Sequence, residues 1–255
     1  MDIFASIDSA ALLAAVIAVT LLAGVVKGAV GFAMPLIMVS GLGMLLEPRI
    51  AVAALILPIV MSNGLQVLRA GLDEAMQAIR DYWLYLLIVC TMILISAQFL
   101  TVIPTDTMFL VLGIPVVLLC AIQLLGLRLS IPENRRTLGA VIAGFLSGAM
   151  GGLAGTWGPP TVLYLVAIDT PKARQLVVQG VIYGLGSVML LLGHLQSGVL
   201  NRDTVGLSAF LIIPAAFGMW AGFKLQDRID QATFRKVTLL VLLLAGLNLI
   251  RRGLV

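Results

Sequence analysis

The sequence predicts an all-α polytopic membrane protein built as two inverted-topology repeats of about five hydrophobic segments each. Hydrophobic residues make up 61% of the 255 residues, charged residues only 11%, and the mean hydropathy is +1.12. A soluble domain carries about 25% charged residues. The second observation is a nonapeptide, Ala-Gly-x-x-x-Gly-Ala-x-Gly, that occurs at residues 23–31 and again at 143–151. A β-barrel would instead show alternating segments of roughly 10 residues, which the sequence lacks.

Charged and Gly/Pro clusters divide the chain into ten hydrophobic segments, five on each side of a polar linker. The linker, residues 128–136, contains Pro132 and is expected to be cytoplasmic. It separates an N-terminal membrane repeat, 1–127, from a C-terminal membrane repeat, 137–255. The expected segments cover residues 10–27, 33–46, 49–70, 80–101, 106–127, 137–152, 158–169, 173–197, 204–224 and 233–251.

The second segment of each half is too short to span a membrane. Segments 33–46 and 158–169 have 14 and 12 residues. As helices they would reach about 21 and 18 Å, against a hydrocarbon core of ~30 Å. Each follows a copy of the nonapeptide and opens with proline, a pattern that points to the substrate site of a secondary transporter. Tight helix packing is the alternative, because glycines four residues apart let membrane helices approach closely.

The basic residues favour a topology in which all ten segments cross the membrane. Crossing places twelve of the sixteen Lys and Arg residues on one side, whereas short segments that dip and return would divide them eight and eight. The positive-inside rule therefore favours crossing, with both termini outside and the two halves inverted relative to each other. Because no basic residue precedes Lys27, the first segment lacks the features of a cleaved signal peptide and is expected to be retained.

The remaining residue types argue against an enzyme, a metal site or a nucleic-acid partner. The acidic residues all fall at termini, in loops or at segment ends, so paired catalytic carboxylates at membrane depth are not expected. Catalytic motifs such as His-Glu-x-x-His are also missing. Cys90 and Cys120 lie in apolar segments without neighbouring ligand residues, so neither a disulfide nor zinc is expected. We expect no cofactor; the expected partners are a small anion and the lipid bilayer, and a homo-oligomer is compatible with the sequence.

Polar residues recur on one side of the eighth segment. Those at helical spacing are Gln175, Gln179, Tyr183 and Ser187, with His194 on the same arc. A comparable cluster on the third segment is Ser62, Asn63 and Gln66. Because polar groups that face lipid go unsatisfied, both sets should face the bundle interior, either to contact substrate or only to join helices. We interpret His194 as an interfacial or packing residue more readily than as a proton-sensitive one.

The starts of the two short helices are the predicted anion site. Proline suits the first helical turn and glycine lets the backbone approach a ligand, so both helices should begin at membrane depth and direct N–H donors to one place. The candidate substrate-binding residues are Gly28, Gly31, Phe32, Pro35, Asn63, Gln66, Gly151, Gly152, Thr156, Trp157, Pro159, Gln179 and Tyr183. Lys27 either snorkels to the cytoplasmic surface or attracts anions.

These motifs resemble the sulfite exporter TauE/SafE family, also called the toluene-sulfonate uptake permease group. The resemblance rests on Gly24-x-x-x-Gly28-Ala-x-Gly31-Phe32-Ala-x-Pro35-Leu36, and on a second copy through Gly148, Gly151, Gly152 and Pro159. It implies a non-enzymatic inner-membrane transporter for sulfite or small organosulfonates such as sulfoacetate. The membrane potential favours anion export, which we expect to occur by alternating access. The alternatives are an anion channel and an uptake permease for another small organic anion.

Overall fold

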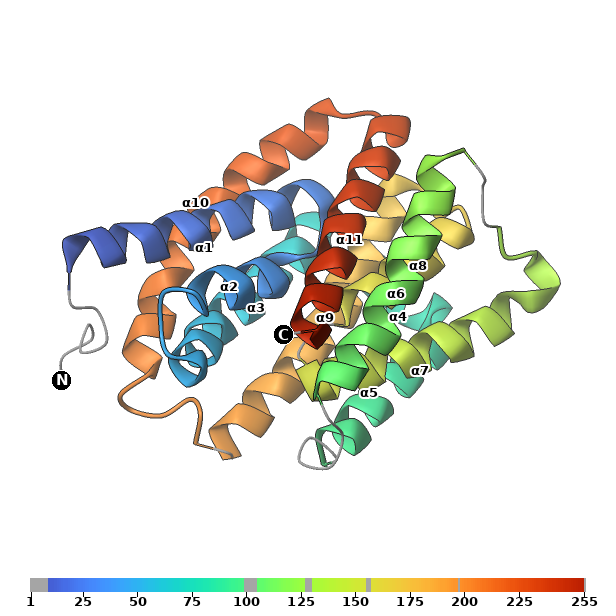
Figure 1. The fold of residues 1–255 in the computed structure, drawn as a ribbon. Helices are drawn as coiled ribbons and strands as arrows, with labels where there is room; N and C mark the ends of the chain where they lie inside the picture. Colours follow the sequence, from blue (N-terminus) through green and yellow to red (C-terminus); the bar gives the residue numbers. More distant parts are fainter. Residues whose placement is uncertain (1–8, 99–104, 127–129, 155–156, 197, 255) are drawn as a thin grey trace. The chain divides into compact units, whose positions relative to one another are not determined.

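In this computed structural model, residues 9–98, 105–126, 130–154, 157–196 and 198–254 are described, and no β-strand occurs among them (Figure 1). The helices are α1 Ala10–Val30, α2 Met34–Leu42, α3 Pro48–Ala70, α4 Leu72–Asp81, α5 Trp83–Gln98, α6 Thr105–Leu124, η1 Glu133–Arg135, α7 Arg136–Ala154, α8 Gly158–Ala167, α9 Lys172–Gln196, α10 Val205–Arg228 and α11 Gln231–Leu254. Over the described ranges, five helices are long and apolar enough to cross a membrane, or six if the bent pair α4 and α5 forms one span. The predicted all-α polytopic class is confirmed.

The first of two compact units comprises Met1–Arg69 and Ser187–Arg228. Its core is apolar and contains α2, and the fully buried side chains include Met34, Met38, Leu42, Ile56, Leu207 and Leu211. Along one side of this core α1 lies against α10 (Figure 1). A Cβ atom on Gly28 would lie 2.4 Å from the carbonyl oxygen of Met219, so the two backbones touch where glycine leaves room.

A proline inside α3 shows how this unit satisfies its buried backbone. Pro58 has no N–H, so the carbonyl of Ala54 loses its usual helical donor. The buried hydroxyl of Ser208 on α10 donates to that carbonyl at 3.2 Å and accepts from the amide of Leu57 at 3.1 Å. One side chain therefore replaces the missing donor of the α3 ladder.

The second compact unit comprises Ala70–Gly186 and Ile229–Val255. In it α5 packs against α7, and α6 packs against α11. Glycines again mark the closest approaches. A Cβ on Gly148 would lie 2.4 Å from the Cβ of Met92, and one on Gly113 would lie 2.9 Å from the carbonyl oxygen of Gly246.

The helix pairs follow one rule in both units. The first helix of the N-terminal half, α1, pairs with α10, the fourth expected segment of the C-terminal half. Likewise α7, the first of the C-terminal half, pairs with α5 from the N-terminal half, and the last helices of the halves, α6 and α11, pair with each other. Two equivalent halves would give this crosswise pairing. The symmetry between 1–127 and 137–255 stays a prediction.

Two short helices lie where the sequence places them. α2 has 9 residues and α8 has 10, and each carries proline in its first positions. They reach about 14 and 15 Å, less than the expected segments, because both end before their apolar sequence does. The prediction of two short, proline-started helices is confirmed.

The segment between α3 and α5 differs from expectation. Residues 71–79 were expected to form a loop before a single segment at 80–101, but α4 occupies this stretch and α5 leaves it at an angle of 83°. The charged residues that suggested a break belong to an amphipathic helix. Its small residues Ala75 and Ala78 are buried, while Asp73 and Gln77 are exposed. This prediction was wrong because charge clustering was read without its helical periodicity.

Candidate functional site

The first glycine-proline element, residues 23–35, contains two left-handed residues between α1 and α2. Gly31 ends α1 at φ 84°, and its N–H donates to the carbonyl of Lys27 at 2.8 Å. This left-handed conformation favours glycine at the end of a helix. Ala33 precedes α2 at φ 74°, which is uncommon for a residue with a side chain. Phe32 and Met34 are buried on either side of it, so packing holds the strained turn in place.

Lys27 is buried beneath this turn, with only 2% of its surface exposed. Its ammonium donates to the carbonyl of Gly31 at 2.8 Å and to Oδ1 of Asn63 on α3 at 2.6 Å. The position near the end of α1 suits a cation, because a helix C-terminus carries partial negative charge. Burial contradicts the snorkelling alternative, which needs the ammonium to reach an aqueous surface.

Other polar side chains surround the end of α1. Gln226 of α10 donates from Nε2 to the carbonyl of Gly28 at 3.0 Å and is buried. Asn63 and Gln66 are buried on α3, and the hydroxyl of Ser62 donates to the carbonyl of Ile59 at 2.9 Å. The structure therefore brings Lys27, Gly28, Gly31 and Asn63 together. Sequence analysis missed Gln226, because only the fold brings the far end of α10 to the glycine motif.

The second glycine-proline element, residues 143–160, carries hydroxyl groups where the first carries an ammonium. The hydroxyls of Ser147 and Thr161 donate to the carbonyl of Trp157 at 3.1 and 2.9 Å. The phenol of Tyr85 on α5 lies 2.8 Å from Ser147 Oγ and 2.9 Å from Thr161 Oγ1. Each hydroxyl has one proton, and all three protons are used inside this network. The network therefore holds the start of α8 and supplies no further donor.

Trp157 is the packing centre of the second element and is buried. Its ring lies 6.4 Å from the ring of Tyr183, whose hydroxyl donates to the carbonyl of Gly158 at 3.3 Å. A Cβ on Gly151 would lie 3.0 Å from the indole, so glycine clearance is needed here too. Pro159 is buried in the first turn of α8. Gly152 lies in α7, and the prediction for Thr156 falls outside the described residues.

The polar stripe of α9 faces the protein interior, as predicted. Its members are all buried, namely Gln175, Gln179, Tyr183 and Ser187. His194 is partly buried near the end of the helix, and its carbonyl accepts from the amide of Leu200 at 3.2 Å. A shared cavity lined by Gln179, Tyr183, Asn63 and Gln66 stays a prediction.

The repeat contains a signal for residues that sequence analysis did not select. Ser147 occupies the position in the second nonapeptide that Lys27 occupies in the first. The carbonyl of the next residue accepts a side-chain hydrogen bond in both copies, from Gln226 to Gly28 at 3.0 Å and from Ser96 to Gly148 at 3.2 Å. Aligning the two copies would have found Ser147. Tyr85, Ser96 and Thr161 lie outside the nonapeptides and carry no such signal.

A match to a known protein family includes both glycine-proline elements. The model of the family described as Sulfite exporter TauE/SafE matches residues 16–249. No curated protein and no solved structure matches the chain. The matched range includes every candidate residue, from Lys27 to Tyr183.

Proposed function

This chain belongs to the sulfite exporter TauE/SafE family, a family of membrane transporters rather than enzymes, and we propose that it exports small sulfur oxyanions across the bacterial inner membrane. The substrates are sulfite or organosulfonates such as sulfoacetate, and transport proceeds by alternating access. The main support for an anionic substrate is the first glycine-proline element. There a buried ammonium lies 2.8 Å from the carbonyl of Gly31, shortly before α2 begins.

The start of α2 and Lys27 favour the same ligand charge. The first amides of a helix have no intrahelical acceptor and carry the positive end of its dipole. Pro35 has no backbone N–H, so it suits the first turn of α2, where an N–H would have no acceptor within the helix. The turn at Gly31 and Ala33 leads the chain into α2. An oxyanion placed at the start of α2 accepts backbone hydrogen bonds and is attracted by Lys27. α8 also carries prolines in its first positions, but its N-cap Trp157 has right-handed backbone angles, φ −84° and ψ −5°, and Ser147 stands where the first element has Lys27.

Ion pairs between helices support the topology in which all ten segments cross the membrane. Arg69 and Asp227 lie 2.5 Å apart, and Arg174 contacts Glu74 at 3.3 Å. If all segments cross, both partners of each pair lie on the predicted cytoplasmic side. If the short segments dip and return, both pairs would have to join opposite sides of the membrane. A hydrocarbon core of ~30 Å rules such contacts out, so the crossing arrangement fits.

Membrane potential supplies a direction for transport. With a negative cytoplasm, moving one negative charge outward gains about 2.3 kcal/mol per 100 mV. Among the Asp and Glu residues whose side chains the structure describes, none is buried, so these residues offer no intramembrane carboxylate for coupling to protons. Export along the potential needs no such group.

Flux of isotope-labelled sulfite from proteoliposomes with an imposed potential tests this proposal. We expect saturable efflux that increases when the compartment holding sulfite is negative, and competition by sulfoacetate. Protein-free liposomes and liposomes holding the Gly31→Ala variant are the controls. Flux equal to that of protein-free liposomes contradicts sulfite transport. Unitary currents in a bilayer recording would instead identify an anion channel, and accumulation against the potential would identify an uptake permease.

A further inference from the structure

Helix α4 combines an exposed apolar stripe with a fixed acidic side. Leu72 and Met76, four residues apart on α4, expose 69% and 50% of their surfaces, and Trp83, the first residue of α5, exposes 60%. Ala75 and Ala78 are buried where the helix rests on its own unit. Single exposed apolar residues are ordinary, but a stripe at helical spacing on a charged helix is an amphipathic surface.

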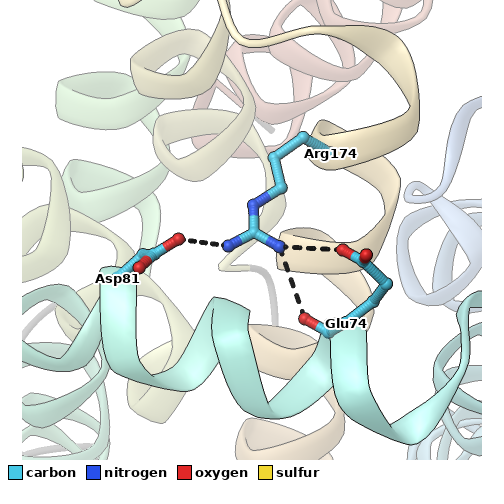
Figure 2. Close-up of polar contacts among 3 residues, drawn as sticks. All are labelled: Glu74, Asp81 and Arg174. Atoms are coloured by element: carbon cyan, nitrogen blue, oxygen red, sulfur yellow. Dashed lines mark hydrogen bonds and ion pairs between the residues drawn. The ribbon is translucent and has the colours of Figure 1, made fainter.

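Arg174 holds the other side of α4. Its guanidinium, on the first turn of α9, donates to Oε2 of Glu74 at 3.3 Å, to the Glu74 carbonyl at 3.4 Å and to Oδ2 of Asp81 (Figure 2). Glu74 and Asp81 are seven residues apart, so both project from one side of the helix, toward Arg174. Because this side is held, the Leu72 and Met76 side cannot turn toward Arg174.

The angle between α4 and α5 indicates how α4 is oriented in the membrane, and its charged residues indicate how deep it lies. α5 is the apolar arm of the bent pair, and α4 leaves it at 83°. Membrane helices tilt by about 20° on average, so a helix almost perpendicular to α5 lies near the membrane plane. Four charged residues, Asp73, Glu74, Arg80 and Asp81, exclude α4 from the hydrocarbon core.

We propose that α4 is an interfacial helix that lies in the headgroup region of the bilayer, with Leu72, Met76 and Trp83 among the lipid chains and its acidic side held by Arg174. We infer that lipid covers this stripe because the neighbouring helix α5 also exposes apolar side chains. Beyond the bend, α5 begins with the exposed Trp83 and carries further exposed apolar side chains, among them Leu87 and Leu94. An amphipathic aromatic ring at this junction suits the membrane–water interface. The proposal does not depend on which substrate is transported.

Spin labels on neighbouring residues of α4 test the proposal in liposomes. In a chain with Cys90 and Cys120 replaced by Ala, nitroxides are placed at Leu72 and Met76, with matched labels one residue on, at Asp73 and Gln77. Collision rates with lipid-soluble oxygen and a water-soluble nickel chelate are compared. We expect oxygen to dominate at 72 and 76 and the chelate to dominate at 73 and 77.

Two results overturn the proposal. Chelate dominance at all four positions means that α4 lies in water, and low collision rates with both reagents at 72 and 76 mean that a protein surface covers the stripe. Quenching of tryptophan fluorescence by brominated lipids provides a second measurement, and it needs no cysteine replacement. Quenching should decrease in Trp83→Phe, and unchanged quenching contradicts insertion of this residue. In Arg174→Gln the contrast between 76 and 77 should shrink, whereas an unchanged contrast contradicts orientation by Arg174.

Discussion

Each of the two glycine-proline elements lies between a long helix and a short, proline-started helix, and the two elements differ in the polar group at the matching position. In the first, Lys27 places an ammonium against the carbonyl of Gly31 and Asn63. In the second, Ser147 stands at the matching position and joins a closed hydroxyl network with Tyr85 and Thr161. A buried cation favours an anion at the adjacent helix start, whereas a saturated neutral network does not. Both copies of the motif therefore have closely packed glycines and a short helix after them, but only the first copy contains a charged residue.

The glycines also differ in what surrounds them. A Cβ on Gly28 would collide with backbone, at 2.4 Å from Met219 O and 2.9 Å from Gly222 Cα. A Cβ on Gly151 would meet only side chains, those of Ile93 and Trp157, both at 3.0 Å. Backbone cannot shift without separating two helices, but side chains can adjust. A methyl group should therefore be tolerated less well at Gly28 than at Gly151, although Gly148, the counterpart of Gly28 in the second copy, also meets backbone, at 2.7 Å from Val89 O.

Gly28→Ala should give the largest effect of any single methyl addition in the two elements. Ordinary overpacking costs about 1–3 kcal/mol, and a collision with backbone should exceed it. We expect loss of folded protein, or a large decrease of the melting temperature in detergent. Gly151→Ala should lower the melting temperature much less, and Gly64→Ala, with nothing within 4 Å of the added atom, should leave it unchanged. Equal melting temperatures for Gly28→Ala and Gly64→Ala would refute tight packing of α1 on α10.

Gly31→Ala should separate folding from transport. Its φ of 84° costs a residue with a side chain about 1–2 kcal/mol, which a folded protein can tolerate. The turn before α2 should shift, and sulfite efflux should be lost while the protein stays folded. Gly151→Ala should retain more flux, because the surrounding side chains can move. Efflux from Gly31→Ala at the wild-type rate would mean that the turn does not shape the site.

Replacing the polar group of each element should affect different properties. Lys27→Met removes long-range attraction but leaves the backbone donors, so the apparent affinity for sulfite should weaken while the maximal rate persists. Ser147→Ala should leave this affinity unchanged and lower stability by about 1 kcal/mol, the usual value of one hydrogen bond. Concentration-dependent flux and thermal unfolding measure the two effects. A weaker affinity in Ser147→Ala than in Lys27→Met would reverse the assignment of charge to the first element.

The smallest effects should come from the matched hydrogen bonds to the glycine motifs. Gln226→Leu and Ser96→Ala each remove one bond to a helix carbonyl, at Gly28 and at Gly148. Both should lower stability by about 1 kcal/mol without changing sulfite affinity. A loss of affinity in Gln226→Leu alone would extend the anion-binding role of the first element to α10.

Sequence patterns predicted the short helices and the interior polar stripe because both depend on local information. Proline after glycine determines where α2 and α8 begin, and helical spacing places Gln179 inside. The partners of the glycines were not predictable, because Gly28 meets α10 nearly two hundred residues later. α4 was missed because its charges conceal its period, and Tyr85 because one phenol in an apolar segment carries no spacing signal.

Equilibrium binding of isotope-labelled sulfite to purified protein tests the central claim, that the first glycine-proline element binds the anion through its backbone. Wild type, Gly31→Ala and Lys27→Met are compared after thermal unfolding has shown that each is folded. The account predicts no measurable binding to Gly31→Ala and weakened, saturable binding to Lys27→Met. Wild-type binding to Gly31→Ala together with none to Lys27→Met would contradict it, because the side-chain charge would then form the site and the glycines would serve only helix packing.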